Sequence, residues 1–192
     1  RDGASTAEHT AEPRVLWRVV EDHLEEASFA LQRTLAGQKS FQYTLRELAL
    51  GPERRLLANL AGVELAGAAA FTRLLAPLFA SPDDAEPGAL GVACLVAIGC
   101  GRFDVLTRLL MEGPDPAFEV LCQAVALEAG QGTERWIREL ADQTHTESGE
   151  VRARLLRLAA TSGLGVEPLW GSLQAAHQGE CEAAAALLRW LP

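Results

Sequence analysis

A glycine pair, Gly99-Cys100-Gly101, stands directly before an apolar helical pattern and is the first candidate for a chemical site. Such a pair can cradle a phosphate, because the backbone N–H groups at the start of a helix point at the anion. A dinucleotide loop also needs a preceding strand and a third glycine, but helical spacing precedes Gly99 and Asp104 occupies the third position. The Gly-Lys-Ser/Thr of a Walker loop is absent too. We therefore interpret the pair as a turn between two helices, with a glycine as the left-handed cap.

His23 is the first candidate for a metal ligand, because Glu21, Asp22, Glu25 and Glu26 flank it. The group has neither the H-E-x-x-H pattern nor the Cys/His spacing of a zinc site. We interpret it as a solvated acidic helix face and predict no metal site.

Two further groups have side chains that could hold a ligand. Arg152, Arg154 and Arg157 could grip a carboxylate or phosphate, and Trp136 and Trp170 could stack on a flat ligand. The simpler interpretation is a solvated helix face for the arginines and core packing for the tryptophans. No serine-hydrolase elbow or other catalytic motif occurs in the sequence. We predict a protein that is not an enzyme and that has no cofactor.

The composition predicts an acidic, helical protein. Hydrophobic residues make up 48% and charged residues 22%, and the formal net charge is −9 with a pI near 5.0. Alanine and leucine dominate the apolar residues, and both favour helices over strands. A nucleic-acid surface needs Lys and Arg to neutralise phosphates, so we predict no nucleic-acid partner. The longest uncharged apolar run, 89–101, is too short to span a bilayer, and we predict no membrane association.

The four cysteines are Cys94, Cys100, Cys122 and Cys181, and no two of them have C-x-x-C spacing. Each lies in an apolar helical run. We therefore expect buried, reduced thiols and a cytoplasmic location.

Three segments in the second half of the chain repeat one another. They are "GCGRFDVLTRLL" at 99–110, "GQGTERWIRELA" at 130–141 and "GLGVEPLWGSLQ" at 163–174. Their second glycines, Gly101, Gly132 and Gly165, are 31 and 33 residues apart. Counted from these glycines, positions +4, +5 and +8 are all apolar: Val105, Leu106, Leu109; Trp136, Ile137, Leu140; Leu169, Trp170, Leu173. An apolar helical run precedes each pair, so the period is helix, glycine turn, helix, which is typical of a two-helix solenoid.

These patterns predict an all-α fold, a HEAT-like helical-repeat solenoid of about nine to eleven helices whose antiparallel pairs are joined by glycine turns. A weaker fourth copy starts at Gly67, with Phe71 at +4 and Leu75 at +8. Earlier in the chain, Gly51-Pro52 is expected to end a helix.

The chain is divided by its polar stretches into an arm and one domain. Residues 1–12 are polar and unpatterned and predict a flexible arm. Residues 13–192 predict a single α-helical repeat domain, with irregular helices over 13–80, a loop over 81–88 and regular repeats over 89–192.

The second helix of each repeat carries charged residues on the side opposite its apolar positions. Stacked repeats would align them as one extended ridge of mixed charge, and solenoids hold protein partners on such surfaces. The predicted partner-binding residues are Asp104, Arg108, Glu134, Arg135, Arg138, Glu139 and Glu167.

The N-terminal part of the chain, at 15–35 and 43–67, resembles an uncharacterised bacterial family of HEAT-like repeat proteins. The family's "H-x-E-E-A-x-F" helix is matched by His23, Glu25, Glu26, Ala27 and Phe29. Its "A-H-L-D-G-L" type segment is matched less well, since Asn59-Leu60-Ala61-Gly62-Val63 stands there without the usual His and Asp. The resemblance covers roughly residues 15–165.

This family is associated with gene neighbourhoods of contractile, type VI-like secretion systems. The resemblance therefore implies an adaptor, chaperone or immunity protein for a secreted bacterial effector. Its members are longer than this chain, so a fragment of a larger repeat protein is a further alternative.

We expect a non-enzymatic protein-binding scaffold whose partner has a basic or mixed-charge surface, because the chain itself is acidic. A ligand-binding or catalytic helical-repeat protein is the alternative. The apolar end, "EAAAALLRWLP" at 182–192, also predicts self-association, because solenoids normally close with a polar cap.

Overall fold

The structure, a computed structural model, describes residues 15–40, 42–128, 130–143 and 149–163. Every regular element in these ranges is a helix, so the predicted all-α class is confirmed there. In chain order they are α1 (Trp17–Gln38), α2 (Leu45–Leu48), η1 (Ala49–Glu53), α3 (Arg54–Leu65), α4 (Gly67–Ala70), η2 (Phe71–Leu75), α5 (Ala76–Ala80), α6 (Pro87–Gly99), α7 (Phe103–Glu112), α8 (Asp115–Leu127), α9 (Gln131–Gln143) and α10 (Gly149–Thr161), where η marks a π-helical segment. Because η1 and η2 join their neighbours without a break, the described residues form eight continuous helices. The predicted total also counts residues 164–192, which lie outside these ranges.

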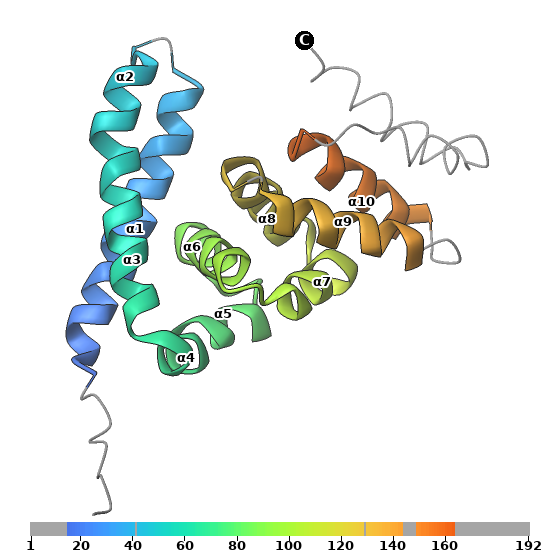
Figure 1. The fold of residues 1–192 in the computed structure, drawn as a ribbon, viewed down its shortest axis with the longest axis horizontal. Helices are drawn as coiled ribbons and strands as arrows, with labels where there is room; N and C mark the ends of the chain where they lie inside the picture. Colours follow the sequence, from blue (N-terminus) through green and yellow to red (C-terminus); the bar gives the residue numbers. More distant parts are fainter. Residues whose placement is uncertain (1–14, 41, 129, 144–148, 164–192) are drawn as a thin grey trace, which may run out of the picture.

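The first two helices, α1 and the continuous α2–η1–α3, form a long antiparallel pair at the left of Figure 1. The second helix runs through Gly51-Pro52, so the prediction that this dipeptide ends a helix is wrong. In a regular α-helix a proline ring collides with the carbonyl one turn earlier. The segment η1 holds one extra residue in its turn, which moves that carbonyl away from Pro52 and lets the helix continue.

Gly67 turns the chain through a corner between α3 and α4. Its φ of 62° is a left-handed conformation that glycine adopts without a Cβ clash. The helices on either side, Leu45–Leu65 and Gly67–Ala80, are bent by 101° relative to one another. Phe71 and Leu75, the apolar positions of the weak fourth copy, are both buried.

The centre of the fold is α6, which is apolar on every side. Ten of its 13 residues are buried, and α1, α3, α5, α7 and α8 all contact it. Its crossing with α1 is close, since a Cβ at Gly91 would lie 2.6 Å from the Leu31 Cδ2. A helix of this composition is stable in water only when neighbours cover it all round.

The predicted loop over 81–88 is shorter in the structure, because α6 begins at Pro87. Glu86 caps this helix by accepting the N–H of Ala89 at 2.8 Å. Proline at the first helical position costs no hydrogen bond, because an N–H there has no partner within the helix.

The repeats of the sequence correspond to a repeated packing of helices. The helices that precede the glycine pairs, α6, α8 and α10, lie side by side in chain order. The helices that follow them, α7 and α9, lie on one side of this row (Figure 1).

The glycine pairs themselves differ from one copy to the next. Gly101 caps α6 as predicted: its φ is 68°, and the Arg102 N–H reaches back to the Ala97 carbonyl at 2.8 Å. After α10 the left-handed residue is Gly163, the first glycine of its pair. The prediction of a cap is wrong for Gly132, which lies inside α9, because α8 already ends at Leu127.

His23 packs against α3 instead of pointing into solvent. Its Nδ1 donates a hydrogen bond to the Asn59 Oδ1 at 2.8 Å, and its ring covers Gly62. The two segments that carry the family resemblance therefore contact each other. The flanking acidic residues are exposed, so the predicted solvated face is correct for them and wrong for the imidazole.

Replacing Gly62 with Ala should destabilise the protein by about 1 to 3 kcal/mol, because a Cβ there would lie 2.5 Å from the His23 ring and would push α1 away from α3. Gly51→Ala is the control, since nothing lies within 4 Å of that position. Urea unfolding followed by circular dichroism measures both changes. Equal midpoints for the two variants would contradict the packing described.

Candidate functional site

The second helices of two adjacent repeats, α7 and α9, contact each other through aromatic side chains. Phe103 stacks on Trp136 with ring centroids 5.3 Å apart, and the Trp136 Nε1 donates to the Thr107 Oγ1 at 2.9 Å. Trp136 is 5% exposed, so it is a core residue, as predicted, with its one polar atom satisfied. Trp170 lies outside the described residues.

The predicted partner-binding residues lie on the opposite side of these helices. Those that the structure describes are all exposed: Asp104 and Arg108 on α7, and Glu134, Arg135, Arg138 and Glu139 on α9. The position of Glu167 lies outside the described residues. Contact between α7 and α9 places two exposed rows of mixed charge on neighbouring helices, which we call the charged face.

The ion pairs on the charged face join residues that are two or four positions apart in the sequence. Arg102 donates to both carboxylate oxygens of Asp104, at 2.9 and 3.0 Å, and these hydrogen bonds lower the pKa of Asp104. The Arg102 guanidinium also lies over the Phe71 ring, 4.5 Å from its centroid. On α9 the Arg135 and Glu139 side chains are 3.8 Å apart and mostly exposed. Such exposed pairs contribute little to stability, so these charges can be exchanged for contacts with a partner.

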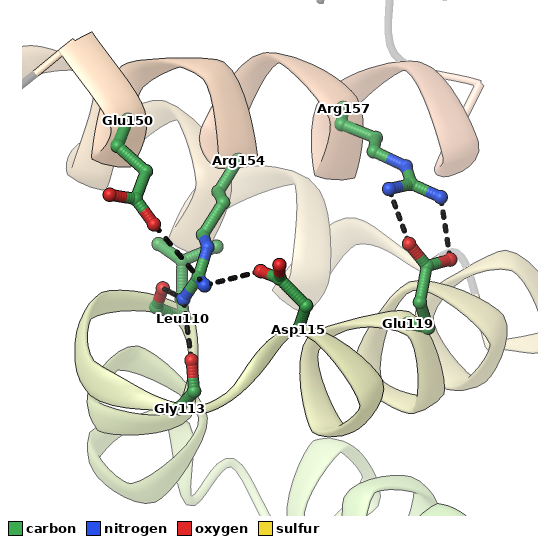
Figure 2. Close-up of polar contacts among 7 residues, drawn as sticks. All are labelled: Leu110, Gly113, Asp115, Glu119, Glu150, Arg154 and Arg157. Atoms are coloured by element: carbon green, nitrogen blue, oxygen red, sulfur yellow. Dashed lines mark hydrogen bonds and ion pairs between the residues drawn. The ribbon is translucent and has the colours of Figure 1, made fainter.

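Arg154 was predicted to belong to a solvated face, and that prediction is wrong. Its guanidinium donates to the backbone carbonyls of Leu110 and Gly113, at 3.2 and 2.7 Å, and to the Asp115 carboxylate at 2.7 Å (Figure 2). The Arg154 side chain is only 12% exposed. It therefore ties α10 to the corner between α7 and α8, where the last carbonyls of α7 have no partner within their own helix.

Arg157 reaches a carboxylate one turn further along the same helix. Its two terminal nitrogens bind the two oxygens of Glu119 on α8 (Figure 2). The Phe118 ring lies beneath both arginines, 5.3 Å from the Arg154 guanidinium and 5.8 Å from that of Arg157. Arg154 and Arg157 thus bind carboxylates, as their chemistry allowed, but these belong to the same chain.

Two hollows in the described part of the chain are small. One, of about 170 Å³, has Glu64, Cys100 and Arg102 at its edge. The other, also of about 170 Å³, lies between α1 and η1 beside Phe29 and Arg33. Ligand pockets have about 300 to 1,000 Å³ and buried polar groups that converge, whereas the charged residues of these hollows are exposed. Within the described ranges, no three His, Cys, Asp or Glu side chains come together as a metal site would require.

One exposed apolar surface was not predicted from the sequence. Leu50, Leu57 and Leu65 point outward from the helix that contains α3 and are 61%, 62% and 89% exposed. Their near-helical spacing was visible, but the helix was expected to break at Gly51-Pro52. Reading Leu45–Leu65 as one helix shows apolar residues on both its sides, with only one side buried.

The cysteines divide into two kinds. Cys94 and Cys122 are buried, and burial raises the pKa of both thiols, that of Cys122 to about 12. Cys100 is exposed at the end of α6, so the expectation that it is buried is wrong. Its exposure agrees with the predicted turn at Gly99-Cys100-Gly101, because Cys100 is the residue that follows the last turn of α6. Cys181 lies outside the described residues.

Comparisons with known proteins return no matching family model, no matching curated protein and no matching solved structure. In the described ranges no single helix is long and apolar enough to cross a membrane; the bent pair Leu45–Leu65 and Gly67–Ala80 reaches that length and composition only when taken together.

Replacing Arg154 with Met should destabilise the protein by about 2 kcal/mol, because the Leu110 and Gly113 carbonyls lose a charged donor. Arg154→Lys should recover less than half of the loss, since an ammonium cannot span the same acceptors. Arg138→Met, on an exposed position of α9, is the control and should change stability by less than about 0.5 kcal/mol. Chemical denaturation measures all three, and equal effects of Arg154→Met and Arg138→Met would refute the assigned role.

Thiol labelling of the folded protein with a maleimide should modify Cys100 rapidly and leave Cys94 and Cys122 unmodified, because the reagent can reach the exposed thiol and not the two buried ones. Peptide mass spectrometry identifies the labelled sites. In denaturant all of them should react, and labelling of Cys122 at the rate of Cys100 in the folded protein would contradict its burial.

Proposed function

We propose that the chain is a non-enzymatic protein-binding scaffold of the HEAT-like solenoid type, and that the charged face of α7 and α9 holds its partner. The side-by-side order of α6, α8 and α10 supports this architecture, because solenoids stack equivalent helices of successive repeats. An extended surface built from equivalent positions is the means by which such proteins bind other chains.

The observation that carries the proposal is the exposure of every described residue predicted to bind a partner. These side chains have both signs of charge, and the chain as a whole has a net charge of −9. A partner with a basic or mixed-charge surface complements them and is steered toward them by the overall field. The association should therefore weaken as salt is added, because exposed charges are screened.

The biological setting follows only from the family resemblance. An adaptor, chaperone or immunity protein for a secreted effector needs a stable, specific protein contact and no chemistry of its own. A cytoplasmic role for this scaffold agrees with the cysteine usage of the sequence. Affinity capture of the full chain from its native cells, followed by mass spectrometry, identifies the partner.

The combined variant Arg135→Glu, Arg138→Glu and Glu139→Arg should weaken binding of the captured partner about tenfold or more, because it reverses the local charge pattern of α9. Arg18→Glu is the control. Arg18 is an exposed residue of α1, and its substitution changes the net charge of the protein by the same amount as the triple variant. Isothermal titration at low and moderate salt measures both. Unchanged affinity in the triple variant would show that the partner binds elsewhere.

A further inference from the structure

We propose that the hollow between α1 and η1 binds an acidic peptide segment of a partner protein, which inserts one aromatic side chain and places a carboxylate on Arg33. The hollow is lined by Phe29, Ala30, Arg33, Gly51, Pro52 and Arg55. It is separate from the charged face of α7 and α9, whose expected partner has a basic or mixed-charge surface.

The hollow exists because two of its lining residues have almost no side chain. Ala30, which is buried on α1, and Gly51, which lies in the wide turn of η1, leave the space open. A Cβ at Gly51 would have no atom within 4 Å. Wide turns of this kind within helices are frequent at functional sites.

The volume of the hollow suits one side chain of a longer molecule. It measures about 170 Å³, whereas a pocket for a whole small molecule has about 300 to 1,000 Å³. A cavity of about 150 Å³ takes up one benzene ring. Phe29 and Pro52 offer flat apolar surfaces against which such a ring can pack. Because Phe29 is 51% exposed, its own ring also gains burial when the hollow is filled.

The two arginines at the hollow differ in what they already bind. Arg55 donates to Glu26 at 2.7 Å, so a carboxylate already neutralises it. Arg33 lies over the Phe29 ring, 5.8 Å from its centroid, and its hydrogen bond to the Tyr43 hydroxyl is long, at 3.4 Å. Within the described ranges no ion pair engages Arg33. The carboxylate of a bound peptide is therefore expected beside Arg33.

The surroundings of the hollow are cationic, although the whole chain has a net charge of −9. Residues 33–55 contain five cations and two carboxylates. The cations are all exposed: Arg33, Lys39, Arg46, Arg54 and Arg55. Salt screens exposed charges over about 8 Å, so a peptide in the hollow responds to these neighbours and not to distant acidic residues. Charge complementarity thus selects an acidic segment.

An anionic membrane is the competing occupant, because it also combines apolar and acidic groups. A membrane is far wider than the hollow, so it would meet the acidic remainder of the chain as well as the local cations. A recessed hollow also receives a protruding side chain better than it receives a flat lipid surface. Both points favour a peptide.

A short capped peptide with one phenylalanine between two pairs of glutamates is the probe, titrated into the isotope-labelled full chain and followed by amide NMR. Its dissociation constant should be about 0.1 to 1 mM, because one anchor and exposed ion pairs supply modest affinity. The amides of Ala30 and Gly51, which line the hollow, should be among those that shift most. Peptides with alanine for the phenylalanine, or with lysines for the glutamates, should bind at least about tenfold more weakly.

Variants of the chain separate the hollow from the surrounding charge. Phe29→Ala removes one wall and Arg33→Met removes the carboxylate partner, so each should weaken peptide binding at least about fivefold. Two exposed residues that do not line the hollow provide matched controls, Leu57→Ala and Arg46→Met. Each control should change the affinity less than about twofold, and circular dichroism should be unchanged in all four variants.

Three results would overturn the proposal. Amide positions that stay unchanged up to about 2 mM peptide exclude binding. Equal binding of the alanine peptide, or equal effects of Arg33→Met and Arg46→Met, would reduce the contact to general charge attraction. Attachment to phosphatidylcholine–phosphatidylserine vesicles that Phe29→Ala abolishes, without any shift caused by the peptide, would assign the hollow to a membrane.

The triple variant of α9 keeps the hollow intact and should leave peptide binding unchanged. Failure of this proposal and failure of the proposed function are therefore separate outcomes.

Discussion

Complete burial of α6 is the constraint on which the rest of the fold depends. A thirteen-residue helix without a polar side must be covered by other helices, and five of them surround it. Because α1 crosses it at Gly91 and α8 covers another side, α6 joins the N-terminal helix pair to the row of α8 and α10 in one core. Each surrounding helix uses one face for this purpose. Their outer faces are consequently free to differ, with mixed charge on α7 and α9 and exposed leucines on α3.

The parts of the fold that local rules decide could be predicted from the sequence. Gly101 caps α6 because a helix end favours a residue that can enter the left-handed region. Leu106, Ile137 and Leu140 are buried because the helical period places them on one face. The exposure of the charged face follows from the same period, since its residues lie opposite the buried ones.

The parts that depend on contacts between distant segments could not be predicted. Arg154 is buried because three acceptors of the α7–α8 corner converge on it, and no spacing within α10 reveals that. His23 meets Asn59 only because α1 and α3 lie side by side. Pro52 is a different case: a rule that holds for regular α-helices predicts a break, and a single wide turn removes the clash on which the rule rests.

The wide turn at Ala49–Glu53 divides one continuous helix into two registers. In a regular α-helix each added residue would rotate the following side chains by about 100°, and the wide turn absorbs one such residue. Deleting one residue there should therefore restore regular geometry and leave Val63 in the core and Leu57 at the surface. A deletion within α3 itself has no wide turn to absorb it and would turn both side chains away from these positions. The wide turn is thus the place in this helix where the chain can change length by one residue without exchanging its inner and outer sides.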